Sequence, residues 1–149
     1  MAIARGAGTE IIRSAMFRAC VGDADTILIV GEQHHIYTLL NLTLYCRAIN
    51  AGGAVQIMQH CYDSKAASGG TSIALARWNP SAVGETFVWD NKLSFNGHEP
   101  TDFSGTLDAT KQNAIADQGH SVSQKLALYV DHANTQIDVH VTFIDQNNA

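Results

Sequence analysis

The segment His35–Ala48 (HIYTLLNLTLYCRA) restricts the possible folds of this chain more than any other stretch. From Leu40 onward apolar and polar residues alternate, so that Leu40, Leu42, Leu44 and Cys46 share one side of an extended chain. A helix would turn Leu42 away from Leu40 and Leu44 and would form no single apolar stripe. The alternation therefore predicts a central β-strand with one face on a core and the other in water.

Further segments with strand character follow one another along the chain. The run 26–30 (TILIV) is continuously apolar, which is typical of a strand buried on both sides. The Gly-Gly loop at 50–53 predicts a β-hairpin between the central strand and 54–62. The pair 87–89 and 92–95 is interpreted as a second tight hairpin or as a bulged strand that turns a corner. The remaining predicted strands are 71–78, 122–130 and 136–144. The segment 9–21 is also interpreted as a strand, because of its β-branched pair and the all-β company, although its spacing fits a helix about as well.

About eight mainly antiparallel strands with regular turn signals predict an all-β fold, a β-sandwich or jelly roll. One long irregular connection covers 96–121, with a short helix at 108–118 that Asp108 caps and Gly119 follows. Residues 1–8 are interpreted as a flexible N-terminal arm and 9–149 as a single domain. The core is expected to contain Leu40, Leu42, Leu44, Val55, Ile57, Leu126, Leu128, Val139, Val141 and Phe143.

Charge and cysteine content exclude several classes of protein. The net charge is −5 and no Lys/Arg cluster is present, which argues against nucleic-acid binding. No apolar run reaches the ~20 residues of a membrane span, and the N-terminus lacks the pattern of a signal peptide. The cysteines Cys20, Cys46 and Cys61 are interpreted as small buried apolar residues of a protein made in reducing cytosol.

Only 15% of the residues are charged, whereas 46% are hydrophobic. Soluble domains usually contain about 25% charged residues. The low value predicts that a large uncharged part of the surface is buried against other chains. The alternative is a mildly polar monomer.

No spacing in the sequence predicts a metal site, a cofactor or a catalytic centre. His34 and His35 are adjacent, so on a strand they would face opposite ways, and further ligands at suitable spacing are absent. Asp23 and Asp25 begin like a calcium loop, but the other oxygen ligands are missing. No nucleophile motif or phosphate-binding glycine loop occurs. We therefore expect a protein that is not an enzyme and that binds no cofactor.

Aromatic and apolar residues in the second half are candidates for partner binding. Phe87 and Trp89 would share one face of a strand, as core residues, as anchors against another subunit, or as a carbohydrate platform. Phe103, Leu107 and Ile115 lie in the irregular connection, where a free loop would leave them in water. These five residues are the predicted partner-binding set.

Three segments carry a resemblance to a known group: 34–44 (HHIYTLLNLTL), 84–105 (GETFVWDNKLSFNGHEPTDFSG) and 137–146 (IDVHVTFIDQ). Together they resemble small β-sandwich virion structural proteins of tailed bacteriophages, in particular marine and cyanobacterial ones. The likeness covers roughly 33–146, and its motifs concern packing and turns, so no functional residue is carried over.

The resemblance implies a non-enzymatic virion protein that is assembled in the host cytoplasm. The first expectation is a capsid decoration (cement) protein that stabilises the phage head by bridging neighbouring capsid subunits. A neck or tail accessory or fibre protein, or a carbohydrate-binding module for host attachment, is the alternative. The expected partners are further copies of the chain, with a homotrimer favoured, and the major capsid protein or other virion proteins.

Overall fold

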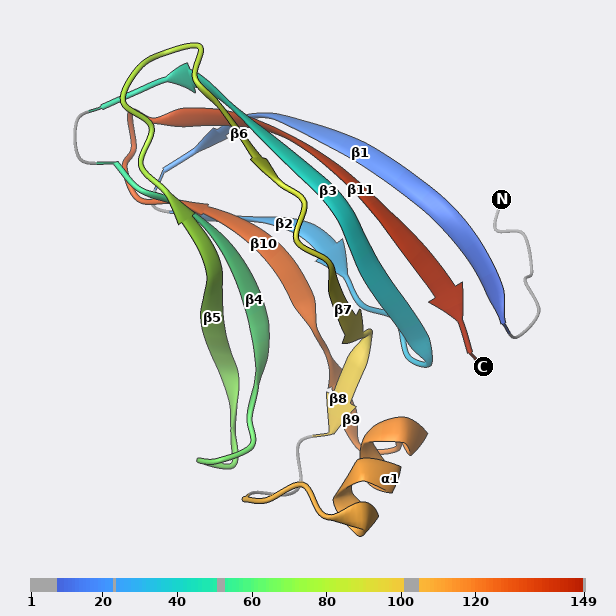
Figure 1. The fold of residues 1–149 in the computed structure, drawn as a ribbon. Helices are drawn as coiled ribbons and strands as arrows, with labels where there is room; N and C mark the ends of the chain where they lie inside the picture. The colour runs from blue at the N-terminus through green and yellow to red at the C-terminus, as the bar shows by residue number, and fades with distance from the viewer. Residues whose placement is uncertain (1–7, 23, 51–52, 101–104, 149) are drawn as a thin grey trace.

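The computed structural model describes residues 8–22, 24–50, 53–100 and 105–148 and contains two antiparallel sheets packed face to face (Figure 1). One sheet has the order β1-β11-β3-β6, and β7 pairs with another part of β3, along the same edge as β6. The other sheet has the order β2-β10-β4-β5. The predicted all-β sandwich is thereby confirmed. The strands are β1 Thr9–Val21, β2 Ala24–Val30, β3 His35–Ala48, β4 Val55–Asp63, β5 Ser68–Trp78, β6 Thr86–Trp89, β7 Leu93–Asn96, β8 His98–Pro100, β9 Ser121–Ser123, β10 Lys125–Val130 and β11 Gln136–Asn147.

Strand β3 occupies the centre of its sheet, between β11 on one side and β6 and β7 on the other. Its alternation is interrupted near the middle, because the register with β11 shifts between Thr142 and Phe143 and leaves Leu40 as an extra residue in β3. A second shift, between Gln136 and Ile137, lies near the end of β3. Leu39 and Leu42 consequently face the core, at 1% and 0% exposure, while Leu40 is half-buried. The prediction of Leu40 as a core residue was wrong for this reason.

The predicted hairpin between β3 and β4 is also wrong. The two strands belong to different sheets, so the connection through Gly53 crosses from one layer to the other. The hairpin in this region joins β4 to β5 instead. At its turn the Asp63 carboxylate accepts hydrogen bonds from the backbone N–H groups of Lys65 and Ala66, at 2.9 and 3.1 Å.

Strands β6 and β7 do not form a tight hairpin, because both pair with β3, one after the other along its length. They are two parts of one interrupted strand, which is nearer to the alternative prediction of a bulged strand that turns a corner. Strand β2 was expected to be buried on both sides, but it lies at the edge of its sheet and exposes Val30 to 55%.

The irregular connection 96–121 contains β8 and a helix, α1 (Ala109–Asp117), and ends at the first residue of β9. Strands β8 and β9 pair antiparallel and form a third, two-stranded sheet. The Asp108 side chain accepts a hydrogen bond from the Lys111 backbone N–H, as the sequence predicts for an N-cap. The helix ends at Gln118, which has a left-handed backbone conformation (φ 52°) and precedes Gly119. In the described part of the chain, no helix is long and apolar enough to cross a membrane.

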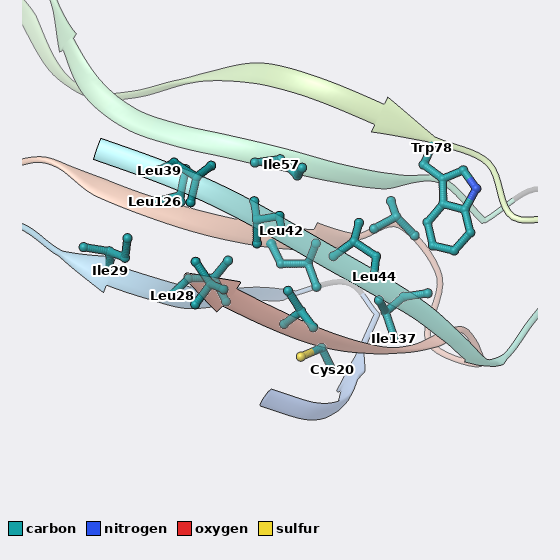
Figure 2. Close-up of a cluster of buried hydrophobic side chains, with 14 of the residues drawn as sticks. Cys20, Leu28, Ile29, Leu39, Leu42, Leu44, Ile57, Trp78, Leu126 and Ile137 are labelled. Atoms are coloured by element: carbon teal, nitrogen blue, oxygen red, sulfur yellow. The ribbon is translucent and has the colours of Figure 1, made fainter. Parts of the chain in front are cut away.

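The core lies between the two sheets and draws side chains from both (Figure 2). Nine of the ten predicted core residues are buried there, Leu40 being the exception. Cys20 and Cys46 are buried, Cys61 is half-buried, and all three are free thiols. The larger fully buried side chains are Leu39, Leu42, Leu44, Ile57, Leu126, Leu128 and Ile137.

Candidate functional site

A pocket of about 480 Å³ lies on the β2-β10-β4-β5 sheet, beside the β8–β9 pair. The pairing of β10 with β4 places His60 opposite Lys125. Both side chains point away from the core, whereas Leu126, the next residue of β10, points into it. Its lining residues are Asp25, Ile27, His60, Cys61, Gly69, Gly70, Thr71, Glu99, Val122, Ser123 and Lys125.

The titratable groups of this pocket do not form a nucleophile and base. His60 Nε2 lies 2.9 Å from Asp25 Oδ2, an ion-pair distance without hydrogen-bond geometry. Burial raises the pKa of the Cys61 thiol, and the negative charges of Glu99 and Asp63 raise it further. A thiol with a raised pKa is a poor nucleophile because the reactive form is the thiolate. This pocket therefore provides no support for covalent chemistry at Cys61.

Glu99 is the most strongly perturbed acid beside the pocket. Burial raises its pKa to about 7, and a backbone hydrogen bond from Tyr62 opposes this shift in part. Nearby groups do not assemble a metal site: among the described residues, no group of three or more His, Cys, Asp and Glu side chains is placed to hold a metal ion.

The histidine and aspartate pairs singled out in the sequence are placed separately. His35 is buried, and its Nδ1 lies 2.6 Å from Asp145 Oδ1, while Nε2 lies 3.3 Å from Glu32 Oε2. His34 has a positive φ of 63° and donates its backbone N–H to Gln118 Oε1. Asp25 contacts His60, and Asp23 lies outside the described residues.

Phe87 and Trp89 lie on the core side of β6, opposite Leu44 and Leu42. Both are half-buried and pack against the core, and the Phe87 ring stacks on Trp78 with 5.6 Å between ring centroids. The strand residue between them points the other way, so Val88 is 54% exposed.

The other members of the predicted partner-binding set are dispersed. Leu107 is 42% exposed just before α1. Ile115 is half-buried and lines a second pocket, of about 320 Å³, together with His34 and Gln118. Phe103 lies outside the described residues. The set therefore forms no single surface in the described part of the chain.

A different surface does form a continuous patch: the side of the β1-β11-β3-β6 sheet that faces away from the core. Cross-strand pairs set its rows, for example Met16 opposite His140, His140 opposite Thr43 and Thr43 opposite Val88. We call this patch the neutral face because it has no Asp, Glu, Lys or Arg. It consists of Ile12, Ser14, Met16, Thr38, Asn41, Thr43, Tyr45, Thr86, Val88, Ser94, His140, Thr142 and Ile144.

Charged residues on this side of the sheet lie at its margin, where Arg47 donates Nε to Asp138 at 3.1 Å. Within the neutral face, Thr38 and Ser94 share a hydrogen bond of 2.9 Å, and Thr43 donates to Asn41 at 2.9 Å. Ile12 and Met16 are 70% and 62% exposed. Sequence reasoning missed the face because alternation identifies a solvent side but not that several such sides join into one patch.

Comparisons with known proteins add little to this description. No family model matches the chain, and no curated protein matches it. One solved structure that is similar comes from work entitled "Bacillus endospore appendages form a novel family of disulfide-linked pili". It is 11% identical, with a TM-score of 0.46 over 100% of this chain and 97% of that chain, and at this level no argument rests on it.

Proposed function

We propose that this chain is a non-enzymatic structural subunit of a virus particle. In the form that the sequence resemblance suggests, it is a capsid decoration protein that bridges neighbouring capsid subunits of a tailed-phage head. The observation that supports an assembly role is the neutral face, and the resemblance supplies the setting. A neck or tail accessory protein would use the same face with fewer copies per particle.

The composition of the neutral face suits contact with another protein. Charged residues are depleted at the centres of protein interfaces, whereas aromatic residues are enriched there. Removing hydroxyl and amide groups from water costs less free energy than removing charges, and the Thr38–Ser94 and Thr43–Asn41 hydrogen bonds already satisfy part of that demand. Tyr45 and Val88 add apolar area, since they are 42% and 54% exposed.

Binding to capsids emptied of this protein tests the proposal. Val88→Glu places a carboxylate on the neutral face, and we expect it to weaken saturable capsid binding at least tenfold, about 1.4 kcal/mol. Val83→Glu is the matched control, because Val83 has 59% exposure in the loop before β6 and lies off the face. Equal binding by both variants and the unmodified chain, or no saturable binding at all, would contradict the proposed function.

A further inference from the structure

Strand β1 lies at the edge of its sheet and is long for an edge strand, with 13 residues. It pairs with β11 in an unbroken register from Thr9 to Phe17. Among the described residues no strand pairs with its other edge, and Figure 1 shows no described segment beyond it. From Glu10 to Phe17 the backbone groups along this edge are therefore available to another strand.

The devices that usually prevent edge pairing are weak here. Strand β1 contains no Pro and no Lys, and its bulge falls after Phe17, at Ala19 with φ 53°. Arg13, which points toward the core side, donates Nε to Asp145 at 3.0 Å, so its charge is balanced within the chain. The regular stretch from Glu10 to Phe17 thus remains a template for pairing.

We propose that β1 pairs antiparallel with β1 of a second copy of this chain, with Ser14 on the two-fold axis. In this register apolar residues face apolar residues and Glu10 faces Arg18, while Arg13, which pairs with Asp145 in its own copy, faces Ala15. The opposed pairs are Glu10 with Arg18, Ile11 with Phe17, Ile12 with Met16, Arg13 with Ala15, and Ser14 with its own equivalent.

Neighbouring registers match less well. Centring the pair on Arg13 sets two guanidinium groups opposite each other, which is unfavourable in a cross-strand pair. Centring it on Ala15 sets Ile12 opposite Arg18 and Arg13 opposite Phe17, so that charges meet apolar side chains. In the Ser14 register apolar pairs form on both faces, and Arg13, the charged residue that faces an apolar one there, is already paired with Asp145.

The Ser14 register also aligns the faces of the two sheets. Opposed residues of an antiparallel pair point to the same side, so the two neutral faces become one surface. Ile12 and Met16 of both copies then form one apolar cluster across the axis, where each copy alone exposes them to 70% and 62%. On the core side, Ile11 of each copy meets Phe17 of the other, and Phe17 already packs against the core.

This pairing closes a dimer, because a two-fold contact joins the same patch on both copies. The trimer expected from the sequence would need a different surface. The inference does not depend on the proposed function, since it rests on β1, and Val88 lies on β6 with two strands between them.

Oxidative cross-linking of full-length Ser14→Cys tests the register directly. Residues opposite each other across an antiparallel pair have Cβ atoms about 4.5–5.5 Å apart, so a small approach of the two strands brings them to the ~3.5–4.5 Å that a disulfide needs. We expect a covalent dimer whose linked peptide contains residue 14 from both copies. Ser94→Cys, an exposed serine on the same face but on β7, is the control and should not cross-link above background.

Sedimentation over a concentration series tests the same edge without cross-linking. We expect a monomer–dimer equilibrium that Ile12→Lys shifts at least tenfold toward monomer, because two lysines would then face the apolar pairs. Ile73→Lys, on the edge strand β5 and 55% exposed, should leave it unchanged. If Ile12→Lys fails to fold, the Ser14→Cys result decides. A chain that stays monomeric, a dimer that Ile12→Lys leaves intact, or equal cross-linking by both cysteine variants overturns the proposal.

Discussion

At the residue scale, Leu39 and Leu40 are neighbours with different environments. The irregular register between β3 and β11 turns Leu39 into the core at 1% exposure and leaves Leu40 half-buried on the other side. Their relative contributions to stability therefore report on the bulge itself.

We expect Leu39→Ala to lower the free energy of unfolding by roughly 3 kcal/mol, because it leaves a cavity in a packed core. Leu40→Ala should lower it by about 1 kcal/mol or less. Urea denaturation followed by tryptophan fluorescence gives both values. Equal costs, or a larger cost at Leu40, would show that the alternation continues without the bulge.

The raised pKa of Glu99 makes the stability of the protein depend on pH. Burial raises its pKa from 4.5 to about 7, so folding favours the protonated acid. Between these two values Glu99 is ionised in the unfolded chain but largely protonated in the folded protein. The free energy of unfolding therefore falls as the pH rises from about 4.5 to about 7. Above that range the loss is complete.

Glu99→Gln should therefore gain stability over the unmodified protein, and the gain should be larger at pH 8 than at pH 5. Glu85→Gln is the control of opposite sign, because hydrogen bonds from Ser81 lower the pKa of Glu85 and stabilise its ionised form. That variant should lose stability at neutral pH, with a smaller loss in acid. Denaturation at several pH values measures the stability of both variants. A gain for Glu99→Gln that does not change with pH would show that the pKa of Glu99 is not raised in the folded protein.

At the scale of elements, two loops depend on close backbone approach. A Cβ on Gly97 would lie 1.9 Å from the carbonyl oxygen of Glu32, in the connection between β2 and β3. Gly97 also donates its N–H to the His35 oxygen at 2.7 Å and accepts from the Gln124 N–H at 2.9 Å. The strand ends at this side of the sandwich meet around a residue without a side chain.

Gly97→Ala should destabilise the protein by about 2 kcal/mol or more, since backbone must move to admit the methyl group. Gly119→Ala, where a Cβ would meet nothing within 4 Å, should change stability by less than about 1 kcal/mol. Thermal unfolding by circular dichroism compares the two. A mild effect at Gly97 would mean that the two loops are not in contact.

Local patterns predicted the elements better than their partners. The alternation in 35–48 and 136–144, and the cap at Asp108, depend on short-range chemistry, and β3, β11 and α1 formed where expected. Whether Gly53 belongs to a hairpin or to a crossing depends on which sheet accepts β4, and that is decided by packing between distant strands. The hairpin prediction failed for this reason.

The same limit applies to the candidate site. Phe87 and Trp89 attracted attention as aromatic residues, but their strand position turns them toward the core. Ile12 and Met16 lie in a segment whose alternation was ambiguous between helix and strand. Their exposure follows from the position of β1 at the edge of the sheet, and the sequence of 9–21 alone does not predict that position.

At the scale of the whole molecule, the neutral face and the free edge of β1 lie on one sheet. The opposite sheet holds the pocket lined by Asp25, His60 and Glu99. A subunit arranged in this way can present one face to a particle and the other to solvent. The neutral face, which contains no charged side chain, is the part of the surface that we propose contacts the particle.

The central claim is the proposal of a structural protein in a phage particle, and the copy number of this protein in purified virions of the source that the proposal implies tests it most directly. Quantitative mass spectrometry against the major capsid protein measures it. A decoration protein that bridges capsid subunits should be present in numbers comparable with those of the major capsid protein. Absence from the virion would contradict a structural role in the particle, and a handful of copies would contradict capsid decoration in favour of a neck or tail position.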